Sequence, residues 1–224
     1  MLVLSDVCYT LIDLNSTYDY IKYLYRYNYW NKKIWFLLKN RLFRIISYII
    51  YKITWFDYNR YITPKFFKDI YTRDLENINK NFWEFYISKK NKILDKIIKH
   101  KESWDDVFLV SASINPPIEF LWSHLWLNYY SSHLEEKEWI YTWKIDNDLL
   151  WKKEKLIETK LLNVEKYDYV VFYTDDFTDI WFIKAIQEKS NNSKFYLILR
   201  KKSWEKKRIK LLLSNNIKDY EFVS

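Results

Sequence analysis

Three short apolar runs that end in small polar or acidic residues constrain the fold of this chain most strongly. They are LVLS at 2–5 before Asp6, DDVFLVSAS at 105–113 with Ser111 near its end, and YDYVVFYTDD at 167–176 with Asp175 near its end. Runs of this length and composition predict buried strands. Because the intervening sequence has helical spacing, we expect an α/β fold with a mostly parallel sheet.

The remaining pattern completes this expectation. The spacing predicts helices over most of 15–100, after Pro116-Pro117 and in a segment ending near 188. It also predicts a turn and helix over 144–162 and strands at 194–200 and 217–224. The predicted architecture is therefore a Rossmann-like parallel sheet core flanked by helices. Residues 1–12 and 101–224 would form this core, and residues 13–100 an inserted all-helical cap.

Composition narrows the class of protein and its surroundings. The apolar fraction of 49% is sufficient for a packed core, and the net charge of +8 favours anionic partners. A single cysteine, Cys8, excludes an internal disulfide and fits a reducing compartment, so we expect a cytoplasmic location. The amino terminus lacks the pattern of a secretory signal. Aromatic residues among the lysines follow helical spacing, so we expect no nucleic-acid partner.

Residues 34–56 are the most apolar stretch of the chain. Their sequence, IWFLLKNRLFRIISYIIYKITWF, is interrupted by four basic residues, whereas a membrane-spanning helix needs about 20 mostly apolar residues. The spacing favours an amphipathic helix. Such a helix would either pack within the protein or contact a membrane surface.

Glycine is absent from the chain, and tryptophan occurs twelve times. Ordinary usage of about 7% predicts roughly 16 glycines in a chain of this length. Several tryptophans, including Trp126, Trp139, Trp143 and Trp151, occupy sites where turns and helix ends favour glycine. We hypothesise that many are UGA codons that the source organism reads as glycine. The alternative is a protein that uses tryptophan as an aromatic anchor.

The polar ends of the predicted strands suit phosphate chemistry. Ligands of open parallel sheets bind at the carboxyl ends of the strands, where Asp6, Ser111 and Asp175 would converge. Acidic side chains can hold Mg²⁺ together with a substrate phosphate. A hydroxyl and a lysine can neutralise the remaining phosphoryl charge.

This ordered set resembles the haloacid dehalogenase superfamily, in its phosphoserine-phosphatase-like branch with a helical cap. The first motif of that superfamily, Asp-x-Asp-x-Thr, is matched by DVCYT at 6–10, and its second by VFLVS ending at Ser111. Its third is a lysine that opens a helix, for which Lys155 is the first candidate and Lys152 the second. Its fourth, an acidic pair after a strand, is matched by Asp175 and Asp179.

The resemblance implies a Mg²⁺-dependent phosphomonoester hydrolase that forms an aspartyl-phosphate. Asp6 is then the nucleophile. The implied metal ligands are Asp6, the backbone carbonyl of Cys8, Asp175 and, directly or through water, Asp179. The implied phosphoryl and substrate contacts are Ser111, Ala112, Lys155 and Thr10, of which Thr10 steadies the first loop.

Cys8 departs from the motif, because phosphatases of the superfamily carry a second Asp there as general acid and base. A thiol of ordinary pKa is a poor substitute. A slow phosphatase, an enzyme that takes its acid from the cap, and a non-catalytic phosphate- or Mg²⁺-binding relative stay open. Halide displacement through the same Asp6 ester is disfavoured, because the pair Asp175 and Asp179 suits a metal that this reaction does not need. The aromatic and basic cap suggests a small phosphorylated substrate with an apolar portion.

Overall fold

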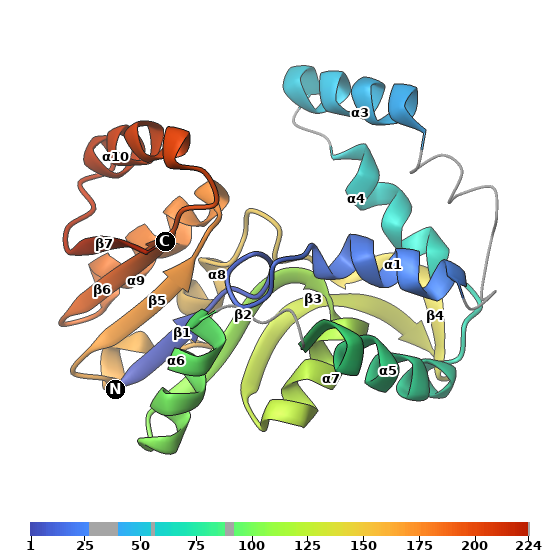
Figure 1. Cartoon of the computed structure of the whole chain (residues 1–224), viewed down its shortest axis with the longest axis horizontal. Coiled ribbons are helices and arrows are strands. Elements are labelled where there is room, and N and C mark those ends of the chain that lie inside the picture. Colours follow the sequence, from blue (N-terminus) through green and yellow to red (C-terminus); the bar gives the residue numbers. More distant parts are fainter. Residues whose placement is uncertain (27–39, 55–56, 88–91, 224) are drawn as a thin grey trace.

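The computed structural model of the protein describes residues 1–26, 40–54, 57–87 and 92–223. Within them a seven-stranded sheet has the order β4-β3-β2-β1-β5-β6-β7 (Figure 1). The strands are β1 Leu2–Ser5, β2 Asp106–Ile114, β3 Asn128–Lys137, β4 Ile140–Asn147, β5 Val170–Thr174, β6 Ser193–Ile198 and β7 Tyr220–Val223. Neighbouring strands are parallel except β3 and β4. The predicted α/β class with a mostly parallel, Rossmann-like sheet is confirmed.

Helices cover both faces of the sheet and form the segment inserted after β1. They are α1 Ser16–Arg26, α3 Arg41–Thr54, α4 Tyr58–Ile62, α5 Glu76–Ile87, α6 Lys92–Glu102, α7 Asn115–Leu125, α8 Lys155–Glu158, α9 Ile180–Lys189 and α10 Glu205–Ser214. The described part of residues 16–87 contains helices and 3₁₀ turns and no strand. Helix α6 packs on β1 and β2 of the sheet. The boundary of the cap at residue 100 stays a prediction.

Alternation along β1 explains how the sheet is buried on both sides. Val3 belongs to a core cluster with α1, α6 and α7, whereas Leu2 and Leu4 belong to a second cluster with α9 and α10. Successive side chains of a strand point to opposite faces, so a run of apolar residues serves both clusters. In register, Val3 lies between Val107 and Val171 of the neighbouring strands.

The region after α7 differs from the prediction. In place of a turn and a long helix over 144–162, the antiparallel pair β3 and β4 extends to Asn147, and α8 spans only Lys155–Glu158. Leu134 and Tyr141 are buried on one face of this pair, and most other side chains of β4 are polar and less buried. The apolar alternation that identifies a strand is therefore weak here.

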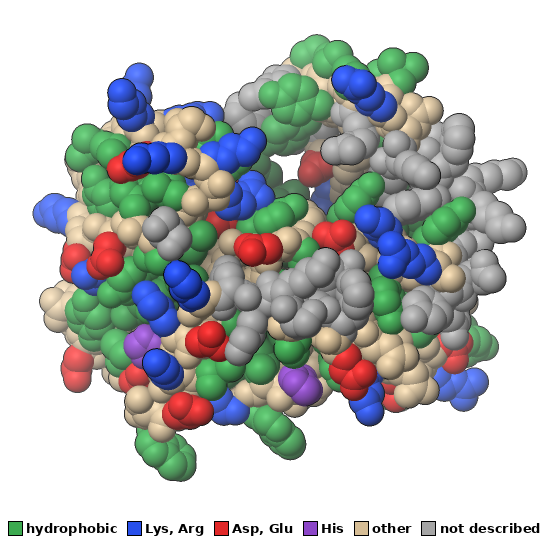
Figure 2. All heavy atoms as spheres, in the orientation of Figure 1, with side chains coloured by type: hydrophobic (Ala, Val, Ile, Leu, Met, Phe, Trp, Pro, Cys, Tyr) green, Lys and Arg blue, Asp and Glu red, His purple; other side chains and the backbone are tan. Residues whose placement is uncertain are grey.

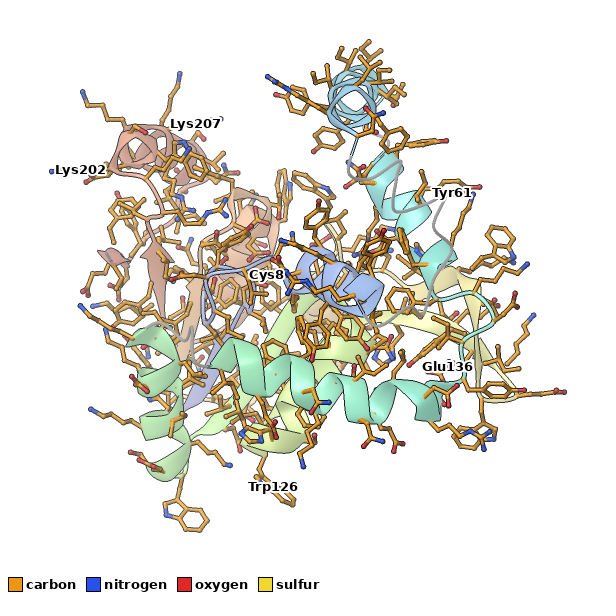
Figure 3. The ribbon with its side chains drawn as sticks, turned by 45° about the vertical axis from the view of Figure 1, so that its right-hand side comes forward. Cys8, Tyr61, Trp126, Glu136, Lys202 and Lys207 are labelled. Carbon is orange, nitrogen blue, oxygen red and sulfur yellow. The ribbon has the colours of Figure 1, made fainter. Side chains whose placement is uncertain are left out.

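Among the residues that the structure describes, four tryptophans adopt a left-handed backbone conformation. The φ angles of Trp104, Trp126, Trp139 and Trp151 lie between 53° and 65°, and their exposed fractions lie between 41% and 96%. Figure 3 shows Trp126 pointing away from the body of the molecule. Such angles favour glycine, which supports the recoding hypothesis at these turns. Trp143, which lies within β4, does not share this feature.

Of residues 34–56, residues 34–39 and 55–56 lie outside the described part of the chain, and the rest is largely α3. No helix in the described residues is long and apolar enough to cross a membrane. Helix α3 lies at one end of the molecule and contacts α4, where Phe43 is 5.6 Å from Tyr58 between ring centroids. One face of α3 thus packs within the protein while the opposite face stays exposed.

Candidate active site

The carboxyl ends of the parallel strands meet at one edge of the sheet, around a cavity of about 530 Å³. Its floor includes Asp6 after β1, Ser111 and Ala112 of β2, and Lys153 before α8. Helices α1 and α4 of the inserted segment supply the opposite wall, with side chains such as Tyr18, Asn59 and Arg60. Figure 2 shows the surface hollowed between the lobe of α10 and the lobe of α3 and α4.

Lys153 is the lysine of this site. Its ammonium lies 3.0 Å from Asp6 Oδ1 and 2.8 Å from Asp179 Oδ1, and all three side chains are less than 10% exposed. Lys155, the predicted residue, is exposed, and so is Lys152. The prediction placed the lysine at the start of a helix, and α8 does begin at Lys155. The lysine that contacts Asp6 and Asp179 is instead Lys153, which lies two residues earlier, in the turn before α8. Its side chain is buried in the site.

The three buried charges of this cluster are mutually dependent. Burial raises the pKa of both Asp6 and Asp179, and the nearby Lys153 lowers each without cancelling the effect of burial. The two carboxylates in turn hold the pKa of Lys153 above its ordinary value. Thr174 Oγ1 also donates a 2.6 Å hydrogen bond to Asp179 Oδ2. Asp179 is thereby fixed as the orienting partner of Lys153.

Asp175 lies at the end of β5 and is held from two sides. Its backbone N–H donates to Thr10 Oγ1 at 3.0 Å, and that hydroxyl donates to Asp175 Oδ1 at 3.3 Å. Arg200, after β6, contacts Asp175 Oδ2 at 3.0 Å and lies 4.0 Å from the centre of the Tyr9 ring. Burial raises the pKa of Asp175 to about 6, although Arg200 opposes this. Thr10 is fully buried and joins the loop after β1 to the end of β5 through these two hydrogen bonds.

Cys8 lies at the cavity among hydroxyl groups. Its sulfur is 3.0 Å from both Ser16 Oγ and Ser113 Oγ, and the backbone N–H of Ser16 donates to it at 3.2 Å. Ser16 Oγ also donates to Ser113 Oγ at 2.6 Å. Burial, together with the nearby charge of Asp6, raises the pKa of Cys8 to about 11. The thiol therefore keeps its proton at neutral pH.

Ser111 and Ala112 both line the cavity. Ser111 is buried, and its hydroxyl accepts a 3.2 Å hydrogen bond from the backbone N–H of Ser113. The carbonyl of Ala112 accepts from Ser132 Oγ of β3 at 3.0 Å. These bonds fix the end of β2 beside Asp6 and leave the Ser111 O–H as a donor at the floor of the site.

A bidentate ion pair holds Arg60, which lines the cavity. Arg60 of α4 lies 2.7 Å through Nη2 and 3.3 Å through Nε from the carboxylate of Asp148, and both side chains are largely buried. The pair joins the inserted helices to the turn after β4. It is a fixed geometric link, because a guanidinium matches a carboxylate in two parallel bonds.

The donor set suits a divalent cation only in part. Burial raises the pKa of Asp6, and repulsion from the nearby Asp175 carboxylate raises it further. Carboxylate oxygens are the ligands that Mg²⁺ prefers. Among the described residues no group of three His, Cys, Asp or Glu side chains is close enough to hold a metal. Lys153 contacts both Asp6 and Asp179. Asp6 and Asp175 thus have the donor chemistry that Mg²⁺ prefers, whereas both oxygens of Asp179 contact Lys153.

No family model matches the sequence, and no curated protein sequence matches it. Solved structures do match. A protein of unknown function from Bordetella pertussis Tohama I is 13% identical, with a TM-score of 0.76 over 100% of this chain and 97% of that one. A phosphoserine phosphohydrolase-like protein from Francisella tularensis SCHU S4 is 15% identical (TM-score 0.57; 98% and 94% covered), and a substrate-bound phosphoserine phosphatase is 15% identical (TM-score 0.55; 92% and 89% covered).

The chain has the haloacid dehalogenase fold. The fold that the four motifs predict, which is also the fold of these phosphoserine phosphatase structures, is confirmed. Within this haloacid dehalogenase fold, the structure brings together Asp6, Cys8, Ser111, Ala112, Asp175 and Asp179 at one edge of the sheet.

Sequence reasoning missed Lys153, Arg200 and the pair of serines around Cys8. Three lysines in the run KKEK cannot be ranked without knowing where the turn ends. Arg200 had a usable signal, because it ends the predicted strand at 194–200 and so lies at the same sheet edge as Asp175. Ser16 was identified only as a helix cap.

Proposed function

We propose that this protein hydrolyses phosphomonoesters in a Mg²⁺-dependent reaction, with Asp6 as the nucleophile. The observation that carries the proposal is the position of Asp6. It follows the central strand β1 at the floor of the cavity and lies 3.0 Å from the ammonium of a buried lysine. A buried carboxylate beside a cation, open to a cavity, is suited to attack an electrophile that carries negative charge.

The reaction would proceed in two displacements. A carboxylate oxygen of Asp6 forms a bond to phosphorus while the bond from phosphorus to the substrate oxygen breaks. The leaving oxygen takes a proton from solvent and departs as the alcohol. A water oxygen then bonds to the phosphorus of the aspartyl-phosphate and gives a proton to solvent, while the bond from phosphorus to the Asp6 oxygen breaks. Inorganic phosphate leaves and the Asp6 carboxylate is regenerated.

Lys153, Ser111 and Ala112 would stabilise the phosphoryl group. The Lys153 ammonium and the Ser111 hydroxyl are donors at the floor of the cavity, and the backbone N–H at Ala112 belongs to the same strand end. Donors that are fixed before substrate arrives stabilise developing charge without reorganisation. Asp179 is a positioning residue, because it holds Lys153 with two oxygens at 2.8 and 2.9 Å.

Mg²⁺ would be held by Asp6, Asp175 and the backbone carbonyl of Cys8, with Asp179 contributing through water. When bound, the ion supplies positive charge to the transferred phosphoryl group. Arg200 contacts Asp175 at 3.0 Å and steadies its carboxylate from the other side. Thr10 fixes the backbone of both motifs through its hydrogen bonds to Asp175.

Cys8 predicts slow turnover. A thiol with a pKa of about 11 is a weak acid for the leaving alcohol, and it offers no base to activate water. The neighbouring Ser16 and Ser113 hydroxyls are not acids either. Nucleophilic attack by Asp6 needs neither group, so the chemistry survives at a lower rate. A non-catalytic phosphate- or Mg²⁺-binding relative is the alternative that complete absence of turnover would favour.

A small phosphorylated molecule with an apolar portion would fit the site as substrate. A second cavity of about 500 Å³ shares Asp57, Arg60 and Leu150 with the first. Its lining includes Tyr61, Pro64 and Ile145, which could receive an apolar group next to the phosphate. Contact of the cap with a membrane surface and a cytoplasmic location stay predictions, and α3 is the element that would make such a contact.

The test is hydrolysis of an aryl phosphate with and without Mg²⁺, using wild-type protein and Asp6→Asn. We expect Mg²⁺-dependent turnover that Asp6→Asn lowers by at least about 10³-fold, because loss of a nucleophile removes the covalent route. Asp13→Asn, at an exposed aspartate of the same loop, is the matched control and should leave turnover unchanged. Turnover that survives Asp6→Asn would overturn the assignment of the nucleophile.

A further inference from the structure

Helix α3 presents an aliphatic face to solvent. Five side chains on it are between 46% and 74% exposed: Leu42, Ile45, Ile46, Ile49 and Ile53. At 100° per residue they lie within an arc of about 100°, so they form one continuous stripe. The opposite side of the helix carries Phe43 and the buried Ser47. The stripe is thus the outer face of a helix whose inner face is already packed.

Helix α10 supplies positive charge at the same end of the molecule. Lys201, Lys202, Lys206, Lys207 and Lys210 are exposed at the start and along this helix. Figures 1 and 3 differ by a rotation about the vertical axis, and in both views α10 and α3 lie at the top of the molecule, α10 on the left and α3 on the right. Figure 3 labels Lys202 and Lys207 there. The hollow of the active site lies between these two lobes (Figure 2).

We propose that this end of the protein docks on an anionic lipid bilayer, with the α3 stripe inserted at the interface and the α10 lysines on the headgroups. An amphipathic helix with an aliphatic face binds in the plane of the interface, and basic residues beside it are attracted to anionic lipid. The α3 sequence contains no acidic residue. A net charge of +8 matches an anionic surface and disfavours a second copy of this chain as the occupant.

Docking in this orientation places the cavity against the headgroup layer. A substrate anchored in the bilayer by acyl chains could then present its phosphate to Asp6, so the substrate class would be lipid phosphomonoesters. This second statement rests on the proposed phosphatase activity. The docking itself does not, because it depends only on α3 and α10.

The test is cosedimentation of the full chain with vesicles of phosphatidylcholine, alone or mixed with phosphatidylglycerol. We expect binding to the anionic vesicles that falls with added salt. Ile49→Glu with Ile53→Glu should weaken it at least about tenfold, and Lys202→Glu with Lys207→Glu by roughly fivefold for each lysine. Leu161→Glu and the pair Lys68→Glu with Lys137→Glu change exposed residues elsewhere and should leave binding intact.

Two outcomes would overturn the proposal. One is absence of binding, or binding that the Ile49 and Ile53 changes do not weaken. The other is a concentration-dependent dimer that those changes dissociate, which would assign the stripe to a second copy. Hydrolysis of a water-soluble aryl phosphate by the same variants separates this test from the proposed function, because α3 variants should leave that activity intact. Vesicle binding by a protein without turnover would retain the docking and remove only the lipid phosphomonoester.

Discussion

The carboxyl edge of the sheet buries charged side chains, whereas part of the outer surface exposes large apolar ones. Both regions depart from the usual burial of apolar and exposure of charged residues. At the edge, Asp6, Lys153 and Asp179 are charged and almost fully buried, and each lies within 3.0 Å of an opposite charge. On the surface, α3 and the tryptophan turns expose large apolar side chains. Buried charges are costly unless they are paired. The paired charges at the sheet edge are therefore explained by the chemistry of the site, whereas the exposed apolar side chains need a separate explanation.

The two kinds of exposed apolar residue teach different lessons. The α3 side chains recur on one helix face, which is the pattern of a surface that binds something. The tryptophans occur singly at turns with positive φ, where the backbone and not a partner determines the preferred residue. The first set indicates an interaction surface, and the second is the pattern that the hypothesis of recoded glycine predicts.

The largest expected effect tests the paired charges at the edge. Lys153→Ala should lower turnover by about 10²–10³-fold and the free energy of unfolding at neutral pH by about 3–5 kcal/mol, because two buried carboxylates lose their cation. Lys155→Ala, at the exposed lysine, should change the free energy of unfolding by no more than about 0.5 kcal/mol. Turnover assays and urea unfolding measure both. Equal effects of the two changes would contradict the assignment of Lys153.

A second change tests whether the missing general acid and base at Cys8 is what limits turnover. Cys8→Asp should raise turnover of an aryl phosphate by about 10²-fold or more, because a carboxyl can protonate the leaving oxygen and then activate water. Cys8→Asn has a similar shape and no titratable proton, and it should give no increase. A Cys8→Asp protein that folds, binds Mg²⁺ and stays as slow as wild type would show that Cys8 is not the limiting departure from the motif.

The pH dependence of stability tests how deeply the edge buries its acids. The pKa of Asp175 is raised to about 6 in the folded protein, so the folded state holds this proton more tightly than the unfolded chain. The stabilisation is complete below about pH 3.8 and is lost as pH rises through about 6. Its upper bound is about 3 kcal/mol. Urea unfolding of metal-free protein between pH 4 and 7.5 measures it.

Asp175→Asn should reduce that pH dependence by the share of Asp175 and leave the share of Asp6 and Asp179, whereas Asp13→Asn, at an exposed residue, should not change it. An unchanged slope in Asp175→Asn would mean that Asp175 does not carry the raised pKa.

The smallest effect concerns the tryptophan turns. Trp126→Gly and Trp139→Gly should each raise the free energy of unfolding by about 0.5–1 kcal/mol, because glycine adopts positive φ without strain. Trp143→Gly, in β4, should lower it by about 0.5–1 kcal/mol, because glycine weakens a strand. Thermal unfolding compares the three. A loss of stability at all three positions would favour genuine tryptophan, and mass spectrometry of the native protein identifies the residue directly.

Much of the fold could be predicted because β1, β2, β5 and β6 are short apolar runs with clear ends. Their parallel order then brings Asp6, Ser111 and Asp175 together without any further information. The β3 and β4 pair could not be predicted, because β3 contains Ser131-Ser132 and Glu135-Glu136 and its turn carries Trp139, which is not a turn signal.

The identity of the site lysine could not be predicted either. Lys152, Lys153 and Lys155 have the same chemistry, and only the turn before α8 decides which one is buried. The exposure of α3 was likewise undecided, because an amphipathic pattern is the same for a helix that packs within a protein and for one that binds a membrane. Tertiary contacts, and not the local sequence pattern, determine which lysine is buried at the site.

The central assignment is tested most directly by trapping the phosphorylated protein. Because Cys8 offers no base to activate water, the aspartyl-phosphate should form with Mg²⁺ and a labelled aryl phosphate and should accumulate before acid quenching. Peptide mapping should place a hydroxylamine-sensitive label on Asp6, and Asp6→Asn should carry none. Turnover without any labelled protein, or a label on another residue, would contradict the role of Asp6.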